Sequence, residues 1–503
     1  MEGISRFLRS RYFWLGFAAL TVFVYLFGLT IPLLGPDEPR YAQVAREMYY
    51  REDWVTTTLG GHNWFEKPAL LYWLQIASYN LFGVNEFAAR FGSALFGLGT
   101  ITSLWLLGRR VSAVDSDGLN SFGNYLGLIA ATTLGIIVFA RGASFDIILT
   151  FPITAACVAF FLYDHASRKA NGAKGMAALA GFYFFVGVSL LAKGLVGIVF
   201  PFAIITFYLL LSRRLPSRAF LLSLLWGLPL TALVAATWYL PKYLTNGWEF
   251  IDEFFIQHHF QRYTSNKYLH PQPFHFFFWV LPLMTIPWLP FFFAAIWRRV
   301  RTLFSRSVDD DTAGINDEAS LLRFAWAWLL VPLVFFSFSG SKLPGYIMPA
   351  VPPAMIITAA FVYRWRNSSG SKDVMVKGLA VATFAVIISL LVFVVPQFAE
   401  RDSVRTLIAK ADAAGYSQLR VAGLHGVSHN AEFYASGRLI RSDDGKQRRL
   451  SGPLEAREAV INSGGKLLVL VPVEWEHELD QIPDVSAERI ASNGDLTIAV
   501  LKQ

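Results

Sequence analysis

The sequence predicts an α-helical polytopic membrane protein with a small α/β domain at the end of the chain. Of its 503 residues, 54% are hydrophobic and only 16% are charged, and the mean hydropathy is +0.43. A water-soluble protein of this length has no use for so much apolar surface. The apolar residues form stretches of membrane-spanning length up to about residue 396, after which the composition changes.

The apolar stretches predict about 11–13 membrane-spanning helices. They fall near 13–34, 88–108, 122–140, 146–163, 175–192, 194–212, 219–240, 274–297, 320–339, 344–363 and 376–396. A segment near 70–83 is a further helix whose place in this count stays open. Basic residues precede the first stretch and no small-residue cleavage site stands before Pro36, so we expect this stretch to remain as a span.

Basic residues divide the loops between the two sides of the membrane. They gather in loops that alternate along the predicted spans, and by the positive-inside rule these loops and the N-terminus are cytoplasmic. The groups are Arg6, Arg9 and Arg11; Arg109 and Arg110; Arg168, Lys169 and Lys174; Arg213, Arg214 and Arg218; Arg298, Arg299, Arg301 and Arg306; and Arg364, Arg366, Lys372 and Lys377. The formal charge of +8 is thus a topology signal and does not indicate nucleic acid. Cys157 is the single cysteine, which excludes an intrachain disulfide.

The opposite side holds the loops 35–87 and 241–273, several short turns and the tail. Within the tail, 419–424 and 467–471 predict buried strands, and 453–461 predicts a helix between them. We therefore divide the chain into a transmembrane domain, 1–396, and an α/β domain outside the membrane, 397–503.

Two adjacent carboxylates, Asp37 and Glu38, stand where the first span ends. Pro36 and Pro39 predict a stiff backbone here that is not a regular helix. One interpretation is a pair of solvated loop charges. The other is a rigid acidic corner that acts as a general base on a lipid-borne substrate. Residues 41–48 then predict an amphipathic helix along the membrane interface.

Two further motifs place charges on the same side. Glu66 and Lys67 lie between aromatic residues and a proline, which suits an interfacial anchor as well as a binding site. Asp146 opens a predicted helix shortly after Arg141. A carboxylate is favourable there as a cap and against the helix dipole, but an ionisable residue at membrane depth is also a functional candidate.

Lysines in tight turns add to these charges. Lys193 and Lys342 each stand between two apolar segments. A single such lysine is usually an anchor. Two of them, with Lys67 and Arg141, form a candidate anion-binding set for a lipid phosphate.

The loop 241–273 is rich in histidine and aromatic residues. His258 and His259 are adjacent, so they point to different faces and make a poor metal pair by themselves. Elsewhere the sequence has no Walker loop, no dinucleotide fingerprint and no nucleophile elbow. The acidic run 309–311 lies among arginine and serine in a cytoplasmic loop, where we expect it to be solvated. An outward-facing site has no access to ATP or nucleotide sugars, so an activated donor has to arrive within the membrane.

Six motifs that stand in one order along the chain resemble a known family. They are Gly35-Pro36-Asp37-Glu38-Pro39-Arg40-Tyr41-Ala42, Trp64-Phe65-Glu66-Lys67-Pro68, Arg141 with Asp146, Leu191-Ala192-Lys193-Gly194, His258-His259-Phe260-Gln261-Arg262-Tyr263, and Ser341-Lys342-Leu343-Pro344-Gly345-Tyr346. Together they resemble the bacterial aminoarabinose transferase family, which modifies lipid A and belongs to the protein-mannosyltransferase-like GT-C glycosyltransferases. The resemblance covers about the first 360 residues.

The resemblance implies a GT-C fold and an enzyme of the bacterial inner membrane with a periplasmic active site and a periplasmic C-terminal domain. Such an enzyme takes a sugar from polyprenyl phosphate, here undecaprenyl phosphate, and places it on lipid A or a related envelope glycolipid. 4-Amino-4-deoxy-L-arabinose is the sugar that the resemblance suggests. Related members use other donors and acceptors, so the sugar and the acceptor stay open.

The resemblance also implies roles for individual residues. Asp37 matches the catalytic carboxylate, and Asp146 matches a second acidic position. Lys67 and Arg262 match positions near the lipid phosphate, with Tyr346 close by. We group four further cations with donor binding: Arg40, Arg141, Lys193 and Lys342.

Two further implications concern a metal and a glycine. Glu66 and His259 match positions associated with a bound zinc ion, and the residues themselves demand no other cofactor. Gly345 departs from the family, which commonly has a bulkier residue there, and we expect it to loosen a pocket wall.

Two alternatives remain beside this hypothesis. Transfer of the sugar to serine or threonine of a protein is the alternative among enzymes. A transporter of lipid-linked sugars is the alternative from another class, but such proteins commonly show internal repeats. No repeat is evident here and the candidate residues all fall on one predicted face, which favours an enzyme.

Overall fold

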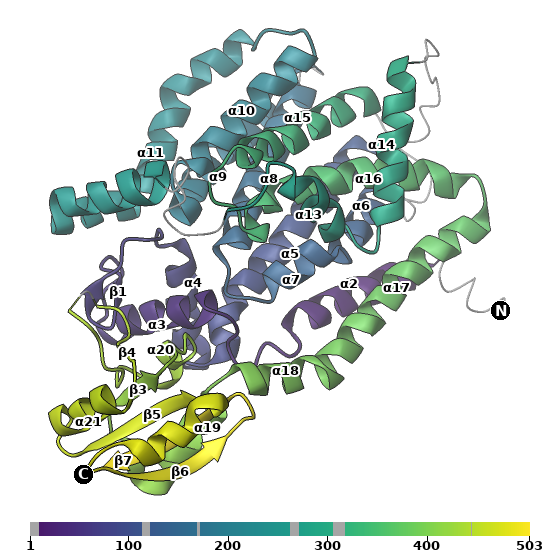
Figure 1. Ribbon diagram of the computed structural model, residues 1–503. Helices are drawn as coiled ribbons and strands as arrows, with labels where there is room; N and C mark the ends of the chain where they lie inside the picture. The colour runs from purple at the N-terminus through teal and green to yellow at the C-terminus, as the bar shows by residue number, and fades with distance from the viewer. Residues whose placement is uncertain (1–9, 113–120, 169–171, 262–270, 305–316, 444) are drawn as a thin grey trace. The chain divides into compact units, whose positions relative to one another are not determined.

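The computed structural model describes residues 10–112, 121–168, 172–261, 271–304, 317–443 and 445–503 (Figure 1). The chain forms two compact units, each built from separate pieces of the sequence. The helical unit comprises Met1–Phe27, Phe65–Leu71 and Phe91–Ile388. The mixed unit comprises Gly28–Trp64, Tyr72–Arg90 and Ser389–Gln503.

Apolar helices occupy each of the eleven stretches that hydropathy singles out. Their bounds are α2 (Arg11–Leu26), α5 (Glu86–Val111), α6 (Phe122–Ala131), α7 (Leu134–Ala140), α8 (Phe145–Arg168), α9 (Gly172–Lys193), α10 (Val196–Leu211), α11 (Arg218–Phe250), α13 (Phe276–Met284), α14 (Leu289–Phe304), α15 (Glu318–Ser337), α16 (Val351–Asn367) and α17 (Gly370–Phe393). A π-helical segment, η1 (Ile251–Gln261), follows α11, and a 3-10 segment, η2 (Pro344–Ala350), precedes α16.

Seven helices of the described chain are long and apolar enough to cross a membrane, and α6 with α7 makes an eighth if this pair, bent by 57°, is one span. Helices α2 and α10 are shorter apolar helices. Apolar helices at the predicted positions are therefore confirmed, while a count of 11–13 crossings stays a prediction.

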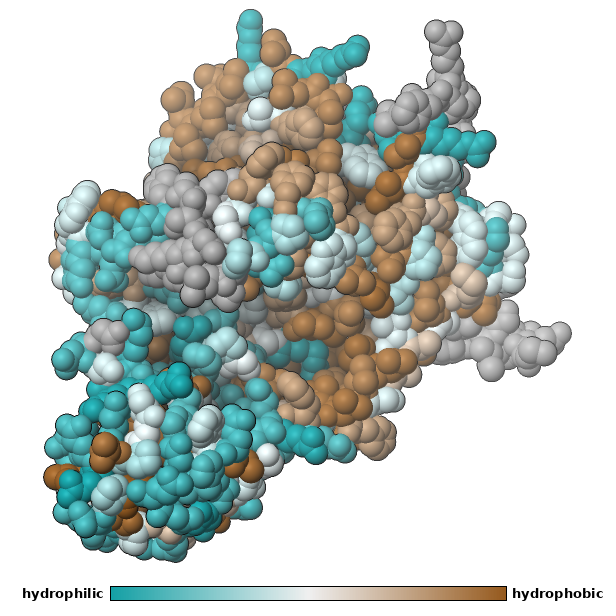
Figure 2. All heavy atoms as spheres, viewed as in Figure 1, coloured by the Kyte–Doolittle hydropathy of each residue, from teal (hydrophilic) through white to brown (hydrophobic). Residues whose placement is uncertain are grey.

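The surface of the helical unit fits a lipid environment. In the most apolar window of α17 only 22% of the residues are buried, and in that of α11 only 28%. Leu225 and Leu233 of α11 are 77% and 69% exposed. Figure 2 shows hydrophobic side chains over these helices and hydrophilic ones over the strands. Exposed apolar area of this extent is stable only when lipid covers it.

The mixed unit contains the tail and the first loop. The loop carries α3 (Asp37–Tyr50), a short hairpin of β1 (Thr58–Leu59) and β2 (His62–Asn63), and most of α4 (Leu70–Phe82). The tail elements are α18 (Val395–Asp402), α19 (Arg405–Ala411), η3 (Asp412–Tyr416), β3 (Val421–Leu424), α20 (Ala431–Tyr434), β4 (Arg449–Leu450), α21 (Pro453–Asn462), β5 (Lys466–Pro472), η4 (Val473–Gln481), β6 (Ser486–Ser492) and β7 (Leu496–Lys502).

The tail folds around one five-stranded sheet of order β4-β3-β5-β7-β6. Strand β3 is parallel to β4 and β5, while β7 is antiparallel to β5 and β6. Alternate residues of β5 enter two cores: Leu467 and Val469 pack with α21, and Leu468 and Leu470 pack with α19. Burial on both faces explains the unbroken apolar run. The predicted strands and helix are confirmed, and a domain boundary at 396/397 stays a prediction.

The backbone around the acidic doublet differs from the prediction. We expected Pro36 and Pro39 to prevent a regular helix, but Pro36 is the N-cap of α3, and Pro39 lies in its first turn. The first four N–H groups of a helix have no acceptor within it, so a proline there removes no hydrogen bond. The prediction was wrong because proline breaks a helix only in its interior. The amphipathic helix expected over 41–48 is the rest of α3.

Candidate active site

Within the helical unit, three of the predicted site residues meet. Asp146 lies in the first turn of α8 and Lys193 in the last turn of α9. The Lys193 ammonium donates to the Asp146 carboxylate, and each side chain is 18% exposed. The same ammonium lies 4.8 Å from the ring centroid of Tyr346. Each charge also stands at the helix end whose dipole favours it.

Gly345 has a different role from the one that we expected. A Cβ atom at this position would lie 1.9 Å from Oδ2 of Asp146 and 2.8 Å from Cε1 of Phe139. Both distances are shorter than van der Waals contact. The absent side chain therefore leaves no loose pocket wall, because the Asp146 carboxylate packs into the space.

Arg141 completes the end of a neighbouring helix. Its guanidinium donates to the carbonyl of Val24 in α2 and, at 2.6 Å, to the carbonyl of Phe27 just after it. The last carbonyls of a helix have no partner within the helix, so these bonds satisfy groups that would otherwise be open. A role of Arg141 toward a lipid phosphate stays a prediction.

Lys342 is also bonded to the backbone. Its Nζ donates to the carbonyls of Ser339 (2.7 Å) and Gln272 (3.0 Å), and the residue is 6% exposed. Desolvation lowers the pKa of Lys342 below its ordinary value. A lysine in this setting stabilises the turn before η2, and its contact with a substrate stays a prediction.

Glu66 and Lys67 form an ion pair in the helical unit. The Nζ–Oε1 distance is 2.7 Å, and the two side chains are 14% and 10% exposed. The preceding Phe65 packs on Phe250 at the end of α11, with 5.9 Å between ring centroids. Lys242 of α11 is buried, with its Nζ 4.6 Å from the Phe65 ring centroid. The segment is thus packed against α11. A residue pair that served only to anchor the chain at the membrane interface would not need these contacts.

Within the mixed unit, Asp37 and Arg40 lie together. Asp37 is the first residue of α3, and its side chain is 51% exposed. Arg40 donates to the Asp37 carboxylate at 2.6 Å and to the carbonyl of Pro36 at 2.8 Å. Its guanidinium carbon lies 5.8 Å from the ring centroid of Trp64. An exposed local pair of this kind contributes at most about 1 kcal/mol to stability, so it leaves the carboxylate available.

Glu38 is held in place by a residue that sequence reasoning missed. The Arg90 side chain is 2% exposed and lies 2.6 Å from the Glu38 carboxylate. It also donates to the carbonyls of Leu29 (2.9 Å) and Pro32 (2.8 Å). An arginine near the end of an apolar stretch requires such partners, and that signal could have identified it. Arg90 fixes the chain that leads into α3, which leaves Asp37 as the open member of the doublet.

The tail also holds this loop within the mixed unit. Arg46 of α3 donates to the carbonyl of Phe433 at 2.7 Å. The Tyr434 hydroxyl donates to Glu86 at 3.0 Å and accepts from the Leu33 amide at 2.9 Å. These bonds position the segment around Asp37.

Comparisons with known proteins identify similar chains and a similar fold. The family model described as dolichyl-phosphate-mannose-protein mannosyltransferase matches residues 15–253. A curated protein of Aeromonas salmonicida named undecaprenyl phosphate-alpha-4-amino-4-deoxy-L-arabinose arabinosyl transferase is 30% identical over 68% of this chain and 59% of its own length. An uncharacterized protein of Aquifex aeolicus is 31% identical over 67% of this chain and 60% of its own. The crystal structure of ArnT from Cupriavidus metallidurans bound to undecaprenyl phosphate superposes with a TM-score of 0.77, at 21% identity and over 97% of both chains.

The chain belongs to the aminoarabinose transferase family. It is a multi-span membrane protein with the GT-C fold, and the match to the solved structure includes the tail. It spans about six tenths of the length of the curated relatives that it matches, 59% and 60% in the two cases above.

The zinc site that the family resemblance implies, with Glu66 and His259 as ligands, stays a prediction. Among the described residues, no three His, Cys, Asp or Glu side chains are grouped so that they could hold a metal ion. The Glu66 carboxylate is engaged by Lys67. The side chain of His259 and the whole of Arg262 lie outside the described residues.

Proposed function

We propose that the protein is a membrane glycosyltransferase that moves 4-amino-4-deoxy-L-arabinose from undecaprenyl phosphate to lipid A or a related envelope glycolipid. The observation that carries this proposal is the shared name of relatives about 30% identical over two thirds of the chain. The bound undecaprenyl phosphate named for the Cupriavidus metallidurans structure supports the same class of donor. We place the reaction at the periplasmic face of the bacterial inner membrane, with a cytoplasmic N-terminus and a periplasmic C-terminal domain.

The proposed chemistry uses the cations of the candidate site for the leaving phosphate and its carboxylates for the acceptor. Phosphate is the leaving group when the bond to the sugar breaks, and cations stabilise the charge that develops on it. Lys67, Lys193 and Arg262 are the residues that we assign to this task, with Arg40, Arg141, Lys342 and Tyr346 in supporting contact with the donor.

Asp37 is the proposed general base. Its exposed carboxylate takes the proton from the acceptor hydroxyl as that oxygen attacks the sugar carbon, a role worth about 10²–10⁴-fold in rate. Asp146 orients Lys193 through their ion pair. Single displacement inverts the sugar carbon, whereas a double displacement through Asp37 as nucleophile retains it. The anomeric configuration of the product distinguishes the two.

A second candidate is transfer to serine or threonine of a protein, as the description of the matching family model suggests. The deciding experiment incubates the purified full chain with undecaprenyl-phosphate-linked aminoarabinose and either lipid A or a Ser/Thr-rich peptide. We expect mass spectrometry to detect one added aminopentose on lipid A and none on the peptide. The reverse pattern would replace the first proposal by the second.

A further inference from the structure

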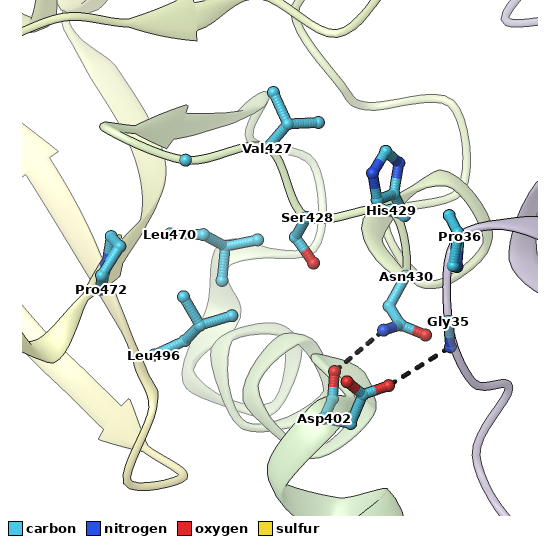
Figure 3. A pocket seen from close by; sticks show the side chains of 11 residues that line it. Gly35, Pro36, Asp402, Val427, Ser428, His429, Asn430, Leu470, Pro472 and Leu496 are labelled. Atoms are coloured by element: carbon cyan, nitrogen blue, oxygen red, sulfur yellow. Dashed lines mark hydrogen bonds between the residues drawn. The ribbon is translucent and has the colours of Figure 1, made fainter. Parts of the chain in front are cut away.

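A pocket of about 290 Å³ opens in the mixed unit beside the residues that lead into Asp37 (Figure 3). Gly35 and Pro36 form one wall, Asp402 at the end of α18 forms another, and the loop 426–430 lies opposite the ends of β5 and β7. All these segments belong to the mixed unit. None of the chemistry assigned above uses this pocket.

The pocket lies where the topology of the sheet favours a ligand. From β3 the chain first forms β4 on one side and then β5 on the other. The carboxyl ends of β3 and β5 therefore flank a switch point, which is where open α/β sheets bind ligands. Gly423 in β3 is required for this geometry, because a Cβ atom there would lie 2.1 Å from the carbonyl oxygen of Gly426. Only glycine lets the loop fold back to line the pocket.

The buried side-chain amide of Asn430, which lines the pocket, has a hydrogen-bond acceptor that none of the described residues satisfies. Asn430 is 5% exposed, and its Nδ2 donates to the carbonyl of Asp402 at 2.9 Å (Figure 3). Its Oδ1 finds no hydrogen-bond partner among the described residues. Leaving a buried acceptor unsatisfied is costly, so a ligand hydroxyl would be a favourable partner.

The other lining groups define the class of ligand. His429 is kept neutral near pH 7, because desolvation and the Arg40 guanidinium both lower its pKa below the ordinary 6.5. A neutral imidazole offers one donor and one acceptor. The described lining residues include no lysine or arginine, which disfavours a phosphate, while Leu470 and Leu496 present an apolar surface. Hydroxyl partners around an apolar wall match the polar edge and the C–H face of a sugar ring.

We propose that this pocket binds a hydroxylated sugar ring next to Asp37. The ring belongs either to the undecaprenyl-linked donor or to the glycolipid acceptor. The identity of that glycolipid rests on the proposed function, but the recognition of a sugar ring does not. Asp37 directly follows Pro36 of the pocket wall, and its charge and that of Arg40 both act on the His429 imidazole. The tail would then contribute directly to substrate binding.

The test fills the pocket from its exposed edge. Val427 lines the pocket and is 40% exposed, so Val427→Trp can occupy the cavity without entering a core. Ile461→Trp in α21 is the matched control, since Ile461 is 44% exposed and does not line the pocket. His429→Phe is a second variant that keeps the shape and removes both ring nitrogens.

The first readout is binding alone. Saturation-transfer NMR with methyl glucoside measures sugar contact with the full chain in detergent. We expect the signal for the wild type and for Ile461→Trp, and its loss in Val427→Trp and His429→Phe. An unchanged signal in both pocket variants would overturn the proposal, whether or not the protein transfers aminoarabinose.

The second readout identifies the source of the sugar. In Val427→Trp we expect the KM for either lipid A or the undecaprenyl-linked sugar to rise by about tenfold or more, the equivalent of roughly 1.4 kcal/mol of lost contact. The substrate whose KM rises is the one whose ring enters the pocket. Normal transfer with both KM values unchanged would overturn the proposal that the pocket binds a sugar ring. The proposed function would still stand.

Discussion

The two candidate carboxylates sit in opposite kinds of environment. Asp146, in the helical unit, is mostly buried, paired with Lys193 from another helix and packed against the backbone of Gly345. Asp37, in the mixed unit, is half exposed, and among the described residues its ion-pair partner is Arg40 of its own helix. The Asp146 carboxylate pairs with a lysine that is 47 positions away in the sequence, so it holds the ends of two helices together. An exposed one with a weak local partner remains free to take a proton.

The acidic doublet repeats this contrast within two residues. Glu38 is fixed by the buried Arg90, while its neighbour Asp37 faces outward. The sequence places two identical charges side by side, and the structure separates them into a positioning group and a candidate reactive group.

The largest expected effect comes from the exposed carboxylate. Asp37→Asn should lower the transfer rate by about 10²–10⁴-fold, because the amide cannot accept the proton. Thermal unfolding should be unchanged, since the pair with Arg40 is worth at most about 1 kcal/mol. Retained turnover in a mass-spectrometric transfer assay would remove Asp37 from its catalytic role.

A large loss of stability should follow removal of the cation behind Glu38. Arg90→Met removes the guanidinium from the mostly buried Glu38 carboxylate, which keeps only neutral donors such as the Leu34 amide, and from several carbonyls, at a cost of about 3–5 kcal/mol. Arg40→Met is the matched control on the exposed member of the doublet and should cost far less. Thermal unfolding of both variants in detergent measures the difference, and equal values would contradict the division of roles.

A smaller loss is expected where Asp146 packs on glycine. Gly345→Ala forces the carboxylate or η2 to move and should destabilise the protein by about 1–3 kcal/mol, the usual range for overpacking. Transfer should fall as well, because Lys193 loses its orientation. Gly378→Ala in α17 is the control, since a Cβ atom there meets nothing within 4 Å and alanine favours a helix. Similar behaviour of the two variants would show that the close approach is unimportant.

The smallest effect should be a pH dependence in the mixed unit. The pKa of His429 is below its ordinary 6.5 in the folded chain, so the folded state binds fewer protons than the unfolded one. The stability from this group is present above pH 6.5 and is lost as pH falls toward the folded pKa. His429→Gln should flatten the stability curve in that window. An unaltered curve would mean that the histidine is hydrated as in an unfolded chain.

Sequence reasoning located the apolar helices and two of the five tail strands, β3 and β5, because those signals are summed over many neighbouring residues. It also grouped Asp146 and Lys193 on one side, and the structure pairs them directly. The first turn of α3 was misread, since the cost of a proline depends on its position within a helix.

The partners of individual charges were beyond prediction. Glu38 is 52 positions from Arg90, and the tail residues that hold the first loop are several hundred positions away from it. Such pairs leave no periodic pattern in the sequence. The role of Gly345 was equally hidden, because a missing side chain gives no sign of the atom that takes its place.

The bond from Arg46 to Phe433 joins residues that are 387 positions apart, and this separation has a consequence for biosynthesis. At ribosomal rates the first loop emerges roughly 20–80 s before the segment that receives its guanidinium. During that interval the loop has to stay soluble and unassembled while most of the helices are still being inserted. A chain that ends before Phe433 would therefore lack the acceptor for the Arg46 guanidinium, and its first loop would be less firmly held.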